Sequence, residues 1–166
     1  MADTVWLHPN RDKGESKATK AVVVLLLVVS ALLIAVVTLG GWSQLQGAQI
    51  VSFGLIVIYL VMAYVVSRWN RGVLPVAAAL AILLAVVAAV AGPSWFERDK
   101  AGFADPGLDP SFLGLLTLIL VPVQILLIAF AMRGFQQQWN VEVEVPPDEA
   151  DRYHGGDRSL GRTQPA

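Results

Sequence analysis

The sequence contains no cysteine. This absence excludes disulfide bonds, thiolate metal sites, iron–sulfur clusters, cysteine-linked lipid anchors and thiol catalysis within the chain. Histidine is scarce as well, because His8 and His154 are the only two and both lie in polar end segments. The chain alone therefore cannot supply two histidine ligands to a haem buried between helices. We predict no cofactor and no metal site.

Charged residues are also few and unevenly distributed. They make up 15% of the chain, against about 25% in a typical soluble domain, and the net charge of −1 gives no reason to expect a nucleic-acid partner. Three long stretches contain no Asp, Glu, Lys or Arg: 21–67, 72–96 and 110–132. About 20 apolar residues are enough to cross a bilayer, and such segments must be helical because lipid cannot satisfy backbone amides.

These stretches predict an all-α integral membrane protein with a four-helix, up-down bundle. Its expected surroundings are the lipid bilayer. The expected transmembrane helices cover about 21–41, 49–69, 73–92 and 111–133. The predicted organisation is a polar N-terminal segment (1–20), a transmembrane domain (21–140) and a C-terminal segment (141–166). In this last segment Val141, Val143 and Val145 alternate with glutamates, which predicts a short extended stretch lying against a partner or the protein's own surface. We expect 148–166 to be disordered.

The distribution of basic residues predicts the orientation. The N-terminal segment carries four Lys or Arg, the turn between the second and third spans two, and the C-terminal segment four, so one side holds ten of the twelve. Basic residues concentrate on the cytoplasmic side of membrane proteins. We therefore expect both termini in the cytoplasm and a multi-pass location in the cell (inner or plasma) membrane.

The fourth span carries the main polar feature within the membrane. Pro122 removes a backbone donor, which frees the carbonyl of Leu118 and predicts a kink, and Thr117 is placed to compensate part of that defect. Gln124 lies two residues further on. It could hydrogen-bond to polar side chains of the first two spans, namely Ser30, Thr38, Ser52, Tyr59 and Tyr64. This site either joins helices or binds a quinone, a lipid or another ligand.

Two further patterns indicate surfaces for packing or docking. Ala77, Ala81, Ala85 and Ala89 recur at i, i+4 spacing, which predicts a ridge of small residues where helices approach closely. Alternatively, alanine is simply common in the source of this sequence. Arg133, Phe135 and Trp139 lie at the end of the fourth span and just beyond it, and the two aromatic residues are four apart and hence on one face of a continuing helix. They form either a partner-docking surface or an ordinary interfacial belt with a basic anchor.

No nucleophile elbow, phosphate-binding loop or paired-histidine metal motif is present, so we do not expect an enzyme. The leading hypothesis is a non-catalytic accessory or scaffolding subunit of a membrane assembly, with other membrane subunits or further copies of the chain as partners. The first alternative is a small channel or transporter for a neutral or lipophilic solute that contacts Gln124. The second is a membrane enzyme using the carboxylates of the loop before the fourth span: Glu97, Asp99, Asp105 and Asp109.

Overall fold

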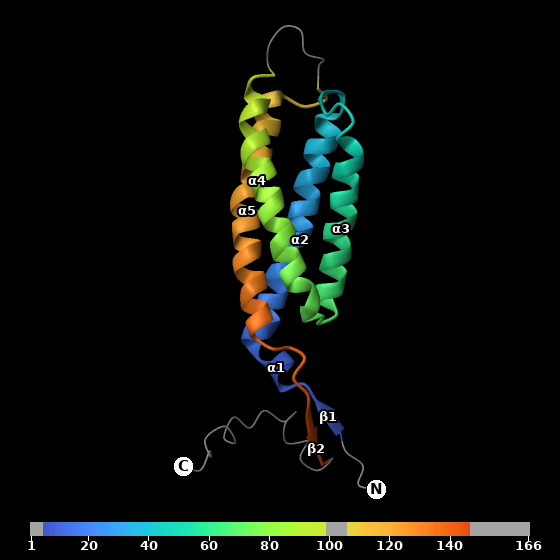
Figure 1. Cartoon of the computed structure of the whole chain (residues 1–166), viewed down its shortest axis with the longest axis vertical. Helices are drawn as coiled ribbons and strands as arrows, with labels where there is room; N and C mark the ends of the chain where they lie inside the picture. Colours follow the sequence, from blue (N-terminus) through green and yellow to red (C-terminus); the bar gives the residue numbers. More distant parts are fainter. Residues whose placement is uncertain (1–4, 99–105, 147–166) are drawn as a thin grey trace.

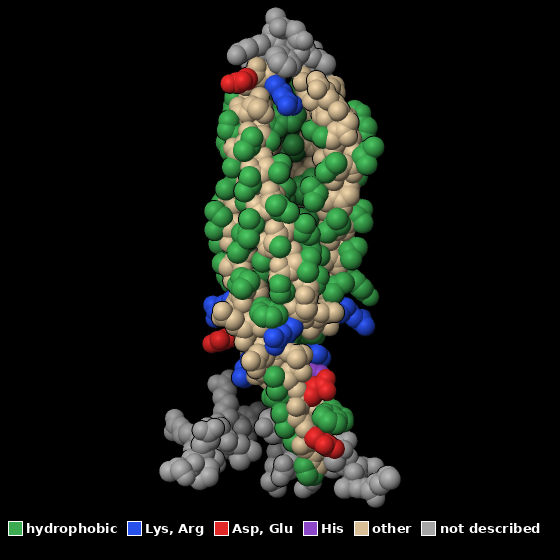
Figure 2. All heavy atoms as spheres, viewed as in Figure 1, with side chains coloured by type: hydrophobic (Ala, Val, Ile, Leu, Met, Phe, Trp, Pro, Cys, Tyr) green, Lys and Arg blue, Asp and Glu red, His purple; other side chains and the backbone are tan. Residues whose placement is uncertain are grey.

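The computed structural model describes residues 5–98 and 106–146, and its dominant feature is a bundle of four long antiparallel helices (Figure 1). Each helix is long and apolar enough to cross a membrane. Apolar side chains cover the sides of the bundle and charged ones gather at its two ends (Figure 2). These features confirm the predicted multi-pass membrane fold. The helices are α2 (Gly14–Gly40), α3 (Gln49–Ser67), α4 (Leu74–Phe96) and α5 (Pro110–Gln136).

Two helix boundaries differ clearly from the predicted ones. The first span was expected from residue 21, whereas α2 begins at Gly14, because the polar residues that follow this glycine are compatible with a helix and include no proline. The third span was expected to end before Pro93, but α4 continues to Phe96. Pro93 lacks an amide donor and its ring crowds the carbonyl four residues earlier, but it lies in the final turn of α4, so only three more residues follow it before the helix ends.

The helices contact one another unevenly around the bundle. α2 packs against both α3 and α5, and α5 packs against α4, while α3 and α4 scarcely touch. We call the end with both terminal segments the terminal end and the opposite one the loop end; they lie at the bottom and top of Figure 1. The buried residues of α3 lie only in its second half, towards the terminal end. The bundle core is therefore closed at the terminal end and incomplete at the loop end.

Short elements complete the described chain. The α2–α3 link contains the 3₁₀ turn η1 (Trp42–Gln44), and η2 (Arg71–Val73) leads into α4. Asp109 caps α5, because its carboxylate accepts a hydrogen bond from the backbone amide of Phe112 at 3.1 Å. An acidic side chain is favourable at a helix N-terminus. Asp109, which the sequence placed among the candidate loop carboxylates, therefore has a structural role.

A small antiparallel sheet lies beyond the terminal end of the bundle. β1 (Val5–Leu7) pairs with β2 (Val143–Val145), with Trp6 opposite Glu144. β2 lies in the segment for which the alternating valines predicted an extended conformation. Its partner is the N-terminal segment, where a three-residue strand is followed by the single-turn helix α1 (Pro9–Asp12). The predicted disordered stretch at 148–166 lies outside the described residues.

Candidate functional site

Gln124 lies at the centre of a buried polar cluster that joins three helices. Its side-chain oxygen accepts a hydrogen bond from the Tyr59 hydroxyl of α3 at 2.9 Å, and its side-chain nitrogen donates to the Ser30 hydroxyl of α2 at 2.8 Å. Ser30 in turn donates to the carbonyl of Leu26 at 2.7 Å. All three polar side chains are fully buried. Tyr59 and Ser30 are two of the five partners that the sequence indicated for Gln124.

This arrangement limits what Gln124 can do. Both ends of its amide group are engaged by neighbouring helices, and no exposed surface is left for a solute. The cluster therefore has the geometry of an interhelical connection rather than of a solute contact. The channel or transporter alternative relied on a contact between the solute and Gln124, and this geometry does not support that contact.

Pro122 and Thr117 do not join this cluster. Pro122 is exposed, and α5 continues through it from Pro110 to Gln136. The hydroxyl of Thr117 donates to the carbonyl of Leu113 at 2.8 Å. The prediction that Thr117 compensates the Leu118 carbonyl is wrong, because this hydroxyl bonds four residues back along its own helix.

The predicted alanine ridge follows the packed face of α4 only at its start. Ala77 and Ala81 are buried, Ala85 is half-buried and Ala89 is exposed. A strict four-residue repeat drifts around a helix that has 3.6 residues per turn. The buried face of α4 instead combines steps of three and four residues, continuing from Ala81 through Leu84, Ala88 and Gly92 to Trp95.

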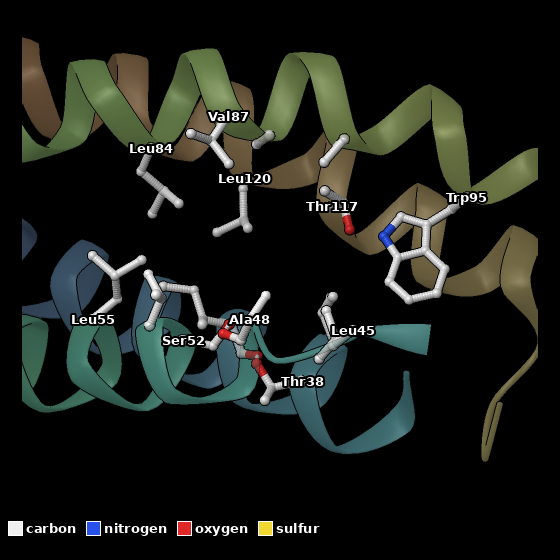
Figure 3. Close-up of a pocket in the computed structure, with 15 residues that line it drawn as sticks. Thr38, Leu45, Ala48, Ser52, Leu55, Leu84, Val87, Trp95, Thr117 and Leu120 are labelled. Atoms are coloured by element: carbon white, nitrogen blue, oxygen red, sulfur yellow. Dashed lines mark hydrogen bonds between the residues drawn. The ribbon is translucent and has the colours of Figure 1, made fainter. Parts of the chain in front are cut away.

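A groove lies where α3 and α4 separate towards the loop end (Figure 3). It has a volume of about 250 Å³, and residues of all four long helices line it. In Figure 3, Leu84 and Val87 of α4 and Leu120 of α5 face the side chains of Leu55 and Leu45 across the space. Trp95 borders the groove near the loop end. Thr117, expected at a kink site, is instead one of its lining residues.

The hydroxyl groups that line the groove are already paired. Thr38 donates to the Ile34 carbonyl at 2.7 Å, and Ser52 donates to the Ala48 carbonyl at 3.1 Å. Thr117 is paired within α5 in the same way. Each hydroxyl proton is therefore used by its own helix, and the groove presents an apolar surface.

Arg98 lies beyond the end of α4, next to the groove. Its guanidinium stacks over the Trp95 ring, 4.5 Å from the centroid, and its Nη1 donates to the carbonyl of Gln44 in η1 at 3.4 Å. The arginine therefore connects the end of α4 to the α2–α3 link. Since Trp95 lines the groove, this connection places a positive charge at its loop end.

A second cluster, the terminal clasp, joins the terminal segments to the bundle. We define it by Trp139, Trp69, Lys20 and Arg11. Trp139 is fully buried and meets Trp69 edge-to-face at a centroid distance of 5.4 Å. Lys20 lies 3.9 Å from the centroid of the Trp69 ring, and Arg11 donates to the Trp139 carbonyl at 2.9 Å. The clasp thus fixes the chain just after β1 and just before β2.

The predicted docking surface is divided by these contacts. Arg133 is exposed and lies 3.7 Å from Glu15, whereas Phe135 is half-buried beneath the Arg71 guanidinium. Trp139 is in the core and cannot present itself to a partner. The prediction placed Phe135 and Trp139 on one helical face, but α5 ends at Gln136 and Gln138 adopts a left-handed conformation with φ of 50°.

The acidic loop is only partly described. Glu97 is exposed and Asp109 caps α5, while Asp99 and Asp105 lie outside the described residues. Among residues 5–98 and 106–146 there is no group of three or more Asp, Glu or His side chains arranged to hold a metal ion.

Comparisons with protein-family models, curated proteins and solved structures find no match to this chain. What the fold and the sites define is a four-helix integral membrane protein with a lateral groove and a small sheet outside the bundle. Its function has to be argued from these features alone.

Proposed function

We propose that this chain is a non-enzymatic accessory or scaffolding subunit of a membrane assembly, which binds its partner through the β1–β2 sheet. The observation that carries this proposal is a two-stranded sheet held outside the bundle by the terminal clasp. Isolated two-stranded sheets are marginal in water. Each strand here has one edge without a strand neighbour among the described residues, and a partner can add an extended segment to such an edge.

The exposed side chains of the sheet indicate the chemistry of that partner. Glu144 is exposed on β2, and Trp6, directly opposite on β1, is 57% exposed. Glu142 precedes β2, and its carboxylate accepts a hydrogen bond from Nε2 of His8 at 3.0 Å. Opposite charges on neighbouring strands are favourable. We therefore propose that the partner segment is extended and basic, and that it comes from another subunit of the same membrane assembly.

Reversing the charge of Glu144 tests this proposal. A tagged chain extracted in mild detergent should retain a stoichiometric second polypeptide, and Glu144→Lys should reduce its amount about tenfold, because like charges would then face each other across the strands. Glu15→Lys is the matched control, since it makes the same charge change on α2 at the same end of the bundle. Equal recovery with both variants would argue against docking at the sheet.

We propose that the subunit lies in the plasma or inner membrane and that both of its termini are in the cytoplasm. The support is the excess of basic residues at the terminal end, which follows the positive-inside pattern. Because the natural sequence lacks cysteine, single cysteines can report the orientation. Gln46→Cys should react with a membrane-impermeant maleimide in intact cells, and Gln136→Cys should react only after permeabilisation. The reverse labelling pattern would place the sheet outside the cell.

A further inference from the structure

The groove between α3 and α4 matches the depth of one membrane leaflet. Along α4 it extends from Leu84 to Trp95, and at about 1.5 Å per residue these positions lie about 16 Å apart. The hydrocarbon core of a bilayer is about 30 Å thick. A transmembrane helix of a partner would need the whole of that depth and a width of about 10 Å, whereas a lipid chain needs only one leaflet.

The walls of the groove suit a hydrocarbon chain. Aliphatic side chains from all four long helices line it, and its three hydroxyl groups (Thr38, Ser52 and Thr117) each bond to their own helix. A polar solute entering this space would lose most of its hydrogen bonds to water and find few replacements, which is costly. An acyl chain entering from the surrounding lipid would lose none.

The loop end of the groove suits a phosphate group. Arg98 is the only Lys or Arg that the described residues place at this end, and its side chain is oriented by Trp95 and by the Gln44 carbonyl. A guanidinium has five N–H donors, and the contact with Gln44 involves only Nη1. Arginine binds phosphate oxygens through charge-assisted hydrogen bonds. The positive charge therefore lies where the head group of a lipid in the groove would be.

We propose that the groove binds one phospholipid of the loop-end leaflet, with an acyl chain between α3 and α4 and its phosphate on Arg98. The phosphate and the acyl chain are common to all phospholipids, so the site recognises this class rather than one head group. This inference is independent of the sheet and of its partner. A lipid bound in this way would fill the half of the bundle in which α3 and α4 do not pack against each other.

Photolabelling tests the acyl-chain part of the proposal. The full chain is reconstituted in vesicles of phosphatidylethanolamine and phosphatidylglycerol that contain a phospholipid with a diazirine near the middle of one acyl chain. Labelled residues are then mapped by mass spectrometry. Label should concentrate on groove residues such as Val87 and Leu55. Ala91→Trp, which fills the groove, should reduce this labelling at least fivefold.

Ala89→Trp is the matched control, because Ala89 is exposed on the same helix and does not line the groove. It should leave the groove labelling unchanged. Labelling spread evenly over the exposed apolar residues, or reduced equally by the two variants, would overturn the proposal. So would replacement of the lipid label by crosslinks to a second copy of the chain.

Retention of phospholipid tests the phosphate contact and does not depend on the folding of the Ala91 variant. Native mass spectrometry of the purified chain should show one bound phospholipid, and Arg98→Gln should weaken its binding about tenfold, as expected for the loss of one charge-assisted contact. Arg133→Gln, at the other end of the bundle, should have no such effect. Unchanged retention in Arg98→Gln would overturn the phosphate assignment, as would displacement of the phospholipid by a neutral prenyl quinone at equal concentration.

Discussion

Replacing Trp139 with alanine should lower the free energy of unfolding by about 3–5 kcal/mol, the usual cost of removing a buried tryptophan. The side chain is fully buried and packs edge-to-face on Trp69. It also lies against α5 at Gly134, where a Cβ atom would come within 3.1 Å of the Trp139 ring. The substitution therefore opens a cavity where the C-terminal segment leaves the bundle. Unfolding in mild detergent, followed by circular dichroism, measures the loss.

Trp6→Ala is the matched control for this prediction. Trp6 lies on β1 and is 57% exposed, so its removal should change the free energy of unfolding by less than about 0.5 kcal/mol. Trp139→Ala should also speed amide hydrogen exchange in β2, because the clasp would no longer hold the chain before the strand. Similar stability losses in the two variants would show that Trp139 does not anchor the terminal segments.

Gln124→Leu should lower the free energy of unfolding by about 1–3 kcal/mol, which is the typical cost of leaving a buried polar group unsatisfied. The substitution removes the acceptor of the Tyr59 hydroxyl, which is fully buried. Ser30 keeps its bond to the Leu26 carbonyl. Hydrogen bonds between membrane helices contribute only about 0.6 kcal/mol on average, so most of the loss should come from the unpaired tyrosine.

A double-mutant cycle tests that interpretation. Tyr59→Phe removes the unpaired hydroxyl, so the double variant Gln124→Leu with Tyr59→Phe should be less destabilised than the sum of the single variants. The same denaturation assay provides the three values. Strict additivity would contradict a direct bond between the two side chains and would assign the loss at Gln124 to packing.

The membrane fold could be predicted because lipid leaves the backbone few choices. An uncharged apolar stretch of sufficient length must form a helix, so the existence of all four spans followed from composition. The candidate partners of Gln124 could also be named, because few polar side chains occur within the spans. The rotation of each helix about its own axis decides which of these candidates bond to Gln124. That rotation is seen only in the structure.

Other features depend on local events that leave a weak trace in the sequence. The segment from Arg133 to Trp139 contains no glycine or proline after Gly134 to mark a helix end, yet Gln138 adopts a left-handed conformation and Trp139 folds back into the core. β1 has only three residues, too few for its alternation to stand out. The groove arises from the separation of α3 and α4, which is a property of the assembled bundle.

The most direct test of the proposed subunit role is site-specific photocrosslinking in native membranes. A photoreactive amino acid at position 144 on β2 should produce a discrete adduct with one other membrane protein, and the adducted peptide should come from an extended, basic segment. The same group at position 86, an exposed apolar site on α4, should produce no such adduct. The account would be contradicted if neither position produced an adduct. It would also be contradicted if position 144 produced only a dimer of this chain.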